Sequence, residues 1–367
     1  MIGLKRGFEA IGCEASASWP LLEPNVLSAF VAAYKPDIVF EVNRPRSDLH
    51  DCEGHFLHVA WIEGARYGTR WLTTRYADSD LLYLMCPPEL LGVEKLIEQP
   101  WRYLWPGADP DVFRPKPIAP SCDLSFVGHL YGPLPASVTD AGVAIQGSEF
   151  GPLSDLISTV ESWTLDALCR PSREIVRSVV AHYRSRGAVL DPADIDRRVA
   201  FLIDEYLPRT ISRTRIARLM LRVSSDTHFH GNAGWVLWPE FMHHYRGELI
   251  DPNALATVFR TSKVNVHFTP WPYHFRTIDC MATGGLILVN RVEDHAYSHG
   301  FNNDFTDGDH YIGYTEDDFV ETASAVLADP VRRARIAAAA AARVAEAHTW
   351  RHRAEQILDD LEWPGYR

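Results

Sequence analysis

The chain has 367 residues, more than a single hydrophobic core usually holds, so two domains are expected. Hydrophobic residues make up 46% of it and charged residues 23%, a balance that is typical of globular proteins and excludes an intrinsically disordered chain. The formal net charge of -12 argues against a general nucleic-acid binder, and no apolar run approaches the roughly 20 residues that cross a bilayer.

Short apolar runs alternate with helical spacing through the first third of the chain. The runs that predict strands are Cys13–Ser18, Asp37–Val42, Phe56–Ile62, Asp80–Met85 and Trp101–Leu104. Helical spacing marks Asn25–Tyr34 and Pro88–Glu98. This alternation predicts a doubly wound parallel sheet with helices on its faces.

Two polar loops follow predicted strands at the edge where such sheets bind ligands. The loop 43–51 carries Asp48 and His50, and Glu63 directly follows the strand that ends at Ile62. Carboxylates and imidazoles in such positions can serve as a general base. Glu63 is the first candidate, and Asp48 and His50 are the second. The alternatives are that Glu63 caps the next helix and that the loop 43–51 is simply solvated.

The middle of the chain changes character, because helical spacing dominates from about residue 153 to 222. The helices predicted there are Arg173–Arg186, Pro192–Tyr206 and Ser212–Leu221. Strand-like runs flank this stretch at Ser125–Gly128 and Thr227–His230, which predicts a second sheet with a helical insertion. After the second of these strands, Gly231 and Gly234 would let backbone amides approach an anion or a sugar.

Strands and helices alternate again toward the C-terminus. The predicted strands are Gly247–Leu249, Lys263–Phe268 and Leu286–Val289, and the predicted helices are Pro252–Phe259, Ala323–Leu327, Val331–Ala347 and Trp350–Glu362. In the loop after Phe268, the rings of Trp271, Tyr273 and His274 offer flat surfaces for a base or a sugar. The alternative is a rigid loop whose aromatic side chains pack inward.

Arg276 and Asp279 stand three residues apart, so on a helix they share one face. The sequence Thr283–Gly285 then stops the helix ahead of the next strand. This charged pair at a helix start predicts a binding site. The alternative is an ordinary amphipathic helix with a surface ion pair and a glycine cap.

Four motifs, in order, resemble those of GT-B glycosyltransferases, most closely the group that includes the spore-maturation-like and related "glycosyl transferases group 1" proteins. In chain order they are the sequence WPGADPDVFRP at Trp105–Pro115, the strand Ser125–Gly128, the Arg-x-x-Asp helix with Ala282–Gly285, and His348–Trp350 with Arg353 and Ala354. The resemblance implies an α/β fold of two Rossmann-like, doubly wound domains. Leu4–Ala10 is similar to the family's first helix, so the strand that precedes that helix in the family is either trimmed here or absent from the sheet.

The implied domains are an acceptor-side domain at 1–116 and a nucleotide-sugar domain at 117–347 that contains the helical insertion at about 153–222. The resemblance sends the helix at 348–367 back across to the N-terminal domain. The alternative is that this helix packs wholly on the second domain.

The resemblance also implies an activity, the transfer of a hexose-type sugar from a nucleoside diphosphate sugar to an unidentified acceptor, with neither a metal nor a cofactor. Asp279 would bind the ribose and Arg276 the phosphates. Further donor contacts are expected from Lys263, Trp271, His274, Thr283, Gly284, Gly285, Gly231 and Gly234, with Arg213 and Arg215 as additional phosphate partners. Asp279 replaces the family's Glu, and Trp271 stands where retaining members often carry a second acid, so the stereochemical course stays open.

Several alternatives stay open beside this activity. The acceptor is a saccharide, a lipid-linked glycan, a protein or a small molecule, and a noncatalytic nucleotide-sugar-binding or scaffold protein would have the same fold. A Rossmann dehydrogenase is disfavoured because no Gly-x-Gly-x-x-Gly follows a predicted strand. The cysteines occur singly, which suggests neither zinc nor disulfides. The lack of a signal peptide predicts a cytoplasmic protein, and the resemblance implies a role in glycan biosynthesis.

Overall fold

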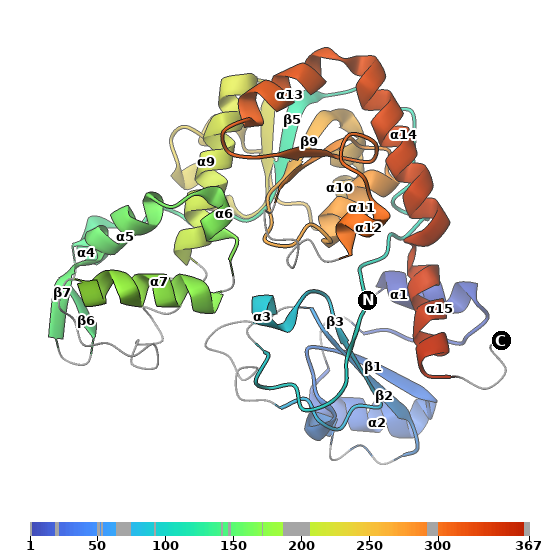
Figure 1. Ribbon diagram of the computed structural model, residues 1–367. Helices are drawn as coiled ribbons and strands as arrows, with labels where there is room; N and C mark the ends of the chain where they lie inside the picture. Colours follow the sequence, from blue (N-terminus) through green and yellow to red (C-terminus); the bar gives the residue numbers. More distant parts are fainter. Residues whose placement is uncertain are drawn as a thin grey trace. The chain divides into compact units, whose positions relative to one another are not determined.

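The computed structural model describes residues 2–18, 22–49, 52, 54–63, 75–91, 93–140, 142–145, 148–170, 172–185, 206–291 and 300–362, and Figure 1 shows its elements. The chain divides into two compact units, and neither is a continuous stretch of sequence. The first contains Met1–Asp111, Tyr273–Asp279 and Ala342–Arg367. The second contains Val112–Pro272 and Cys280–Ala341.

The first unit is built on a four-stranded parallel sheet. Its strands are β1 (Ile38–Val42), β2 (Leu57–Ile62), β3 (Leu81–Leu84) and β4 (Arg102–Tyr103), in the order β1-β2-β3-β4. Its helices are α1 (Ile2–Ala10), α2 (Pro24–Tyr34), the short η1 (Arg46–Leu49) and α3 (Pro88–Leu91), together with α15 (Trp350–Asp360). The order of the described strands follows the chain without a reversal.

Both faces of this sheet are covered, because side chains alternate along each strand. On one face, Val39 of β1 packs with Leu27 and Val31 of α2. On the other, the ring of Trp61 from β2 lies edge-on to that of Trp350 from α15, with ring centroids 6.1 Å apart. The apolar run in β2 is therefore buried on both sides, as is usual in parallel sheets.

Helix α15 is fastened to α1 and to the sheet within this unit. A Cβ atom on Gly7 of α1 would come within 2.3 Å of the Trp350 carbonyl oxygen, so the close approach of the two helices requires a glycine there. The Tyr83 hydroxyl of β3 donates to Asp360 at 2.6 Å, and the Gln356 amide donates to the Tyr103 carbonyl at 2.9 Å. These contacts fix α15 along its whole length.

The second unit is built on a five-stranded parallel sheet. Its strands are β5 (Cys122–Val127), β8 (Thr227–His230), β9 (Ser262–His267), β10 (Ile287–Asn290) and β11 (Ile312–Tyr314), in the order β11-β10-β9-β5-β8. The longer helices are α9 (Leu207–Val223), α10 (Pro252–Thr261), α11 (Phe275–Ala282), α13 (Phe319–Ala328) and α14 (Pro330–Ala347), with the short η5 (Ala233–Leu237), η6 (Met242–His244) and α12 (Phe301–Asp304). Helices α11 and α14 each pass from one unit to the other.

The main core of the second unit lies on one face of this sheet. Phe126 of β5 and Val266 of β9 pack there with Met220 of α9 and Phe319 of α13. Helix α10 covers the other face, where the side-chain amide of Asn265 donates to the Phe259 carbonyl at 3.0 Å. The sheet is thus the middle of three layers (Figure 1).

Between β5 and α9 the chain forms a mostly helical insertion. It contains α4 (Ala136–Thr139), the antiparallel pair β6 (Gly142–Ile145) and β7 (Ser148–Pro152), α5 (Leu153–Glu161), α6 (Leu165–Leu168) and α7 (Ser172–Ser185). Most of the helix predicted at Pro192–Tyr206 lies outside the described residues. The hairpin β6-β7 has no counterpart in the sequence prediction.

The structure confirms the predicted α/β class with two parallel sheets. Two predicted strands are wrong, because Cys13–Ser18 and Gly247–Leu249 form no strand. The first of these is a run of small residues that lacks the β-branched side chains of strands. The helix expected at Pro88–Glu98 ends at Leu91, and of the helices that the structure describes, none has the length and apolar character that crossing a bilayer requires.

Candidate functional site

The second sheet has a topological switch point between its strands β5 and β9. From β5 the chain crosses to β8 on one side, and from β9 it continues to β10 on the other. In open α/β sheets, ligands bind outside the carboxyl ends of the strands at such a point. The loops that begin at Gly128 and Phe268 are therefore the first part of the candidate site.

Side chains that bond to its backbone hold the loop after β5 in place. The Trp235 indole donates to the Gly128 carbonyl at 2.7 Å, and the Asn232 side chain accepts from the amide of Leu130 at 2.8 Å. Arg213 donates to the His129 carbonyl. The exposed His129 ring lies 3.5 Å from Glu248. Arg213, expected to bind phosphate, thus supports this loop in the structure.

Gly231 and Gly234 pack directly against the same loop. A Cβ on Gly231, whose φ is +143°, would come within 2.2 Å of the Gly128 oxygen, and one on Gly234 within 1.7 Å of the Leu130 oxygen. The Gly231 amide donates to the Gly247 carbonyl at 3.1 Å. The two glycines therefore serve the approach of one backbone to another, whereas the sequence predicted an approach to a ligand.

The loop after β9 is clamped by Asn290 at the end of β10. The Asn290 side chain accepts from the amide of Thr269 at 2.9 Å and donates to its carbonyl at 3.0 Å. The Thr269 hydroxyl donates to the Trp271 carbonyl at 3.1 Å. Trp271 is half-buried, and its indole nitrogen is buried without a hydrogen-bond partner among the described residues. The loop is thus preorganised, with one indole donor still unused.

Arg276, Asp279 and His274 meet at the start of α11, within the first unit. The His274 ring accepts from the Arg276 amide at 3.2 Å and so caps the helix. Asp279 is partly buried, and burial raises the pKa of its carboxyl well above the usual range. Nearby Asp109 raises that pKa further, whereas Arg276 lowers it. The protonated form of Asp279 is thus favoured more than in a free carboxyl, and in that form the group can both donate to and accept from a hydroxyl.

Aromatic side chains surround this helix start within the first unit. Tyr273 is 2% exposed, stacks on Trp105 with ring centroids 4.7 Å apart, and shares a 2.7 Å hydrogen bond with His348. Phe275 lies 5.8 Å from Trp61, again between ring centroids. Tyr273 thus packs inward, which was the alternative for this loop.

Thr283, Gly284 and Gly285 end α11 in a Schellman motif. The amide of Gly285 donates to the Cys280 carbonyl at 3.1 Å, and that of Gly284 to Met281 at 3.0 Å, with Gly284 at a φ of +74°. The amide and the hydroxyl of Thr283 also donate to Cys280. These amides satisfy helix carbonyls at the negative end of the helix dipole, so the structure gives them a capping function instead of the expected phosphate contact.

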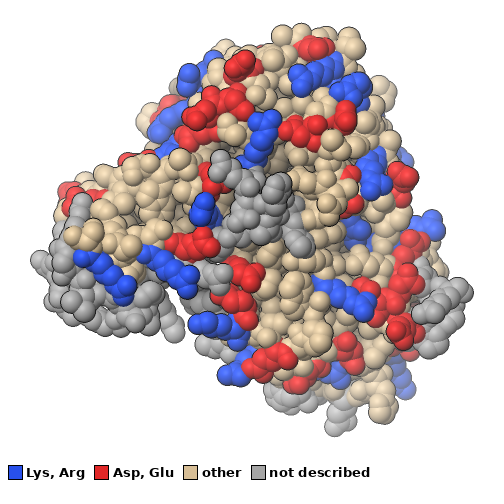
Figure 2. Space-filling model, in the orientation of Figure 1, with Lys and Arg blue, Asp and Glu red and all other residues tan. Residues whose placement is uncertain are grey.

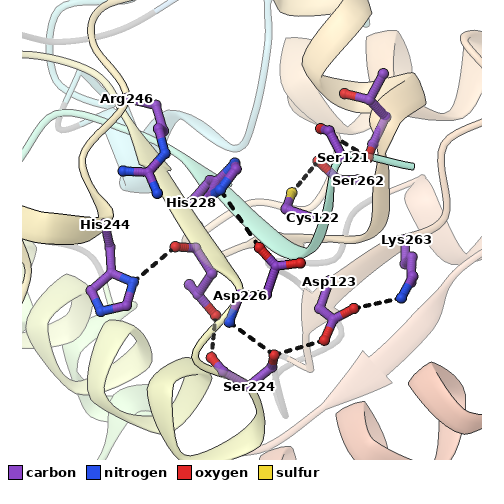
Figure 3. Close-up of polar contacts among 12 residues, drawn as sticks. Ser121, Cys122, Asp123, Ser224, Asp226, His228, His244, Arg246, Ser262 and Lys263 are labelled. Carbon is purple, nitrogen blue, oxygen red and sulfur yellow. Dashed lines mark hydrogen bonds and ion pairs between the residues drawn. The ribbon is translucent and has the colours of Figure 1, made fainter. Parts of the chain in front are cut away.

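Lys263 lies at the amino end of β9, opposite the edge where the ligand is expected. Figure 3 shows it beside Asp123, to which its ammonium group donates at 2.7 Å, and Ser224 donates to the same carboxylate at 2.7 Å. Both bonds hold the pKa of Asp123 below its usual range. Arg215 also has protein partners, the Trp163 carbonyl and Glu316. We therefore leave both residues out of the donor site.

In the first unit, Glu63 follows β2 at the carboxyl edge and is partly exposed. Its amide donates at 2.9 Å to the side chain of Asn43, which follows β1 with a φ of +55°. Asp48 belongs to the short helix η1. His50 lies outside the described residues. Glu63 and the end of β1 are thus brought together, as parallel strands require.

One acidic residue of this sheet was missed by the sequence prediction. Glu41 of β1 is 7% exposed, and burial raises its pKa to about 7, although Arg44 lies 3.7 Å away and lowers it. A single carboxylate inside the apolar strand Ile38–Val42 is the signal that could have identified it. A carboxyl that titrates near neutrality is suited to proton transfer.

Comparison with known proteins identifies the fold. Residues 197–359 match the family model described as glycosyl transferase-like. Sucrose-phosphate synthase from Thermosynechococcus elongatus is similar over 92% of this chain and 76% of its own, at 10% identity and a TM-score of 0.53. The chain has the GT-B fold. A glycosyltransferase from Rickettsia africae ESF-5 matches over 95% of this chain and 84% of its own, at 10% identity and a TM-score of 0.45. No curated protein matches the chain in sequence.

These comparisons confirm the resemblance to GT-B glycosyltransferases, and the spore-maturation-like subgroup stays a prediction. The family match covers the elements from α9 to all but the last residue of α15, with the switch-point loop after Phe268 and all of α11. In this GT-B chain, the face that Figure 2 shows has Lys and Arg side chains interspersed with Asp and Glu among the described residues. Among the described residues on that face, the basic side chains form no continuous surface.

Proposed function

We propose that the chain is a glycosyltransferase that moves a sugar from a nucleoside diphosphate sugar to an acceptor hydroxyl. The observation that carries the proposal is the glycosyl transferase-like match over residues 197–359, because these residues contain the loop after β9 and the whole of α11. The GT-B fold gives the second sheet its switch point, where a nucleotide is expected to bind.

In this proposal the donor's nucleoside is held at the start of α11. Asp279 shares hydrogen bonds with the ribose hydroxyls, and Arg276 pairs with the diphosphate, whose oxygens its guanidinium matches in bidentate fashion. His274 and Trp271 provide flat surfaces for the base or the sugar. The other expected donor contacts support the fold around the donor and do not touch it in this proposal. These residues are Lys263, Thr283, Gly284, Gly285, Gly231 and Gly234.

The catalytic base of the proposal is Glu63, because it combines a place at the carboxyl edge of β2 with partial exposure. Glu41 has the better pKa but is buried, so it is the second choice. Charge that develops on the leaving diphosphate would be stabilised by Arg276, with no metal involved. Turnover that survives full chelation with EDTA would support this part, and loss of turnover that Mg²⁺ or Mn²⁺ restores would contradict it.

A thermal-shift panel of nucleoside diphosphates and their sugars tests the donor. A specific ligand stabilises the folded protein by mass action, so the correct base should raise Tm well above the others. In Asp279→Ala we expect binding of that nucleotide to weaken by about 1 to 3 kcal/mol, because a desolvated hydrogen bond is lost. The control is Asp317→Ala, which removes an exposed carboxyl from the second unit. Equal affinity in the two folded variants would contradict the role of Asp279.

The runner-up function is a noncatalytic nucleotide-sugar-binding protein of the same fold. Incubation of the stabilising nucleotide sugar with saccharides, lipid-linked glycans, proteins and small hydroxylated molecules separates the two. Release of the nucleoside diphosphate together with a glycosylated acceptor supports the transferase. Tight binding with neither transfer nor hydrolysis across these acceptor classes would favour the binding protein.

A further inference from the structure

The outer edge of the second sheet gathers basic side chains on β8, the strand next to β5. We propose that His228 and His230 of β8, together with Arg246, form a binding site for a phosphate-type oxyanion. The ligand class is a small doubly charged oxyanion, either inorganic phosphate or a phosphate monoester. This site is separate from the proposed donor site and does not depend on it.

The two histidines lie on the same face of β8. Phe229 between them is fully buried in the core, so the side chains at 228 and 230 point to the opposite face. Their ring centroids are 6.4 Å apart. In the neighbouring strand, the uncharged Ser125 pairs with His228 and the uncharged Val127 with His230. The charge that β5 does bring to this face is Asp123, which is paired with Lys263 at 2.7 Å.

Arg246 belongs to a segment that runs along the free edge of β8. Tyr245 forms a parallel bridge with Phe229, and the Arg246 amide donates to the Phe229 carbonyl at 2.9 Å. Because Tyr245 shares the face of Phe229, the next side chain lies on the face of the histidines. Figure 3 shows the guanidinium of Arg246 beside the ring of His228.

The guanidinium of Arg246 is only partly used by the protein. It is exposed, and Nη1 donates to the carbonyls of His243 at 2.8 Å and Tyr245 at 3.1 Å. Those two bonds orient the group without neutralising it. The remaining nitrogens of its planar fork match the oxygens of a phosphate.

His230 supplies an independent sign of a missing ligand. Its side chain is 6% exposed, and Nδ1 is buried without a hydrogen-bond partner in the described part of the chain. The ring also forms a hydrogen bond with the backbone of Gly247, so Nδ1 is the atom that a ligand would have to reach. A buried polar atom that lacks a partner destabilises the folded state, so a bound group that reaches Nδ1 would relieve this cost.

Arg246 is the positive charge beside the rings that would attract an anion. Burial, His228 and Arg246 lower the pKa of His230 to about 4, and burial, Arg246 and His244 lower that of His228. Asp226 is the opposing charge, 3.7 Å from His228. Both rings are therefore neutral near pH 7 in the free protein. An oxyanion would raise these pKa values, so binding takes up protons and strengthens as pH falls.

Histidine side-chain NMR during titration with inorganic phosphate tests the site directly. We expect the ring signals of His228 and His230 to move and saturate, whereas those of the exposed His243 do not follow. In Arg246→Gln the apparent affinity should fall about 10-fold or more, because a charge-assisted bidentate contact is lost. The matched control is Arg222→Gln, which removes the same charge from an exposed position on α9.

Three results would overturn the site. Equal shifts of the same ring signals in sodium chloride at equal ionic strength would reduce the effect to charge screening. Equal phosphate affinities in Arg246→Gln and Arg222→Gln would show that the Arg246 guanidinium does not bind the phosphate. Displacement of phosphate by a nucleoside diphosphate would assign the rings to the donor site. Nucleotide binding that persists in Arg246→Gln, while phosphate binding is lost, supports a separate site and leaves the proposed function intact.

Discussion

The two sheets of this protein place their polar groups in different ways. In the second sheet the strand order reverses at β5 and β9, and uncharged side chains hold the backbone of the loops there, as the Trp235 indole does at Gly128. In the first sheet the described strands follow the chain without reversal, and a carboxylate, Glu41, is buried inside a strand. The order of the strands thus decides where the second sheet offers a binding site, at its carboxyl edge. In the first sheet, single carboxylates mark the candidate positions.

The difference predicts how each edge responds to substitution. The carboxyl edge of the second sheet should be disturbed when a glycine there gains a side chain. It should not respond to the loss of charges at the amino ends of the strands. The first sheet should behave in the opposite way. Added methyl groups should change it little, whereas its stability and activity should depend strongly on its carboxyl groups and on pH. Each prediction below tests one side of this contrast.

The largest expected effect is on the stability of the second unit, in Gly231→Ala. The new Cβ would meet the Gly128 oxygen at 2.2 Å at a φ of +143°, so we expect unfolding to become easier by about 3 to 4 kcal/mol. Gly308→Ala is the control, because its φ is +84° and the added Cβ meets nothing. There we expect about 1 kcal/mol. Equal losses in urea unfolding would mean that the close backbone approach is unimportant.

A pH effect on stability comes next, and it concerns Glu41. Its pKa is raised from 4.5 to about 7, so the stabilisation from the protonated form is complete below pH 4.5 and is lost as pH rises through 7. This shift corresponds to on the order of 3 kcal/mol. In Glu41→Gln that loss should vanish from urea unfolding curves at pH 4.5 to 8. His58, whose pKa is lowered to about 4, acts in the opposite direction and is common to both proteins. A parallel pH profile in the variant would show that Glu41 titrates normally.

The third effect is catalytic and belongs to the first edge. If Glu63 is the base, Glu63→Gln should lower turnover by about 100-fold and leave the affinity for the donor nearly unchanged. Asp78→Asn removes an exposed carboxyl from the same unit and should retain activity. Full turnover in the Glu63 variant would transfer the role to Glu41 or Asp48.

The smallest effect is expected at the amino end of β9. Lys263→Met breaks a partly exposed ion pair with Asp123, and such pairs are worth about 0 to 1 kcal/mol. Calorimetric titration with the nucleotide found in the thermal-shift panel should give the wild-type affinity. A tenfold weaker affinity would return Lys263 to the donor site and contradict the assignment of ligand binding to the carboxyl edge.

Most elements of the fold could be predicted because their patterns are local. Thr227–His230 and the helix Asn25–Tyr34 follow directly from apolar spacing, and the structure contains both within one residue. The strand expected at Gly247–Leu249 failed for a tertiary reason. The chain runs beside β8 at Tyr245–Gly247, where the hydrogen bonds are too few to form a strand. Nothing in those residues alone indicates that neighbour.

The site was less predictable, because it depends on partners that are distant in sequence. Lys263 looks like a phosphate ligand until Asp123, 140 positions away, is found beside it. Gly231 was singled out correctly as a special backbone position, yet the group that approaches it is a carbonyl from another loop. Glu41 was visible as an acid in an apolar strand, whereas its raised pKa needed the burial that only the fold provides.

The position of α15 has a consequence for how the protein is made. The first unit contains Met1–Asp111 but is completed by Ala342–Arg367, where Trp350 fits against the glycines of α1. A ribosome must therefore synthesise the second unit before the first can bury Trp61 against its partner. Domains usually fold in the order of synthesis, from the N-terminus onward. Here the second unit should become protease-resistant first on stalled nascent chains, and the N-terminal sheet should stay open to cleavage until α15 has left the ribosome.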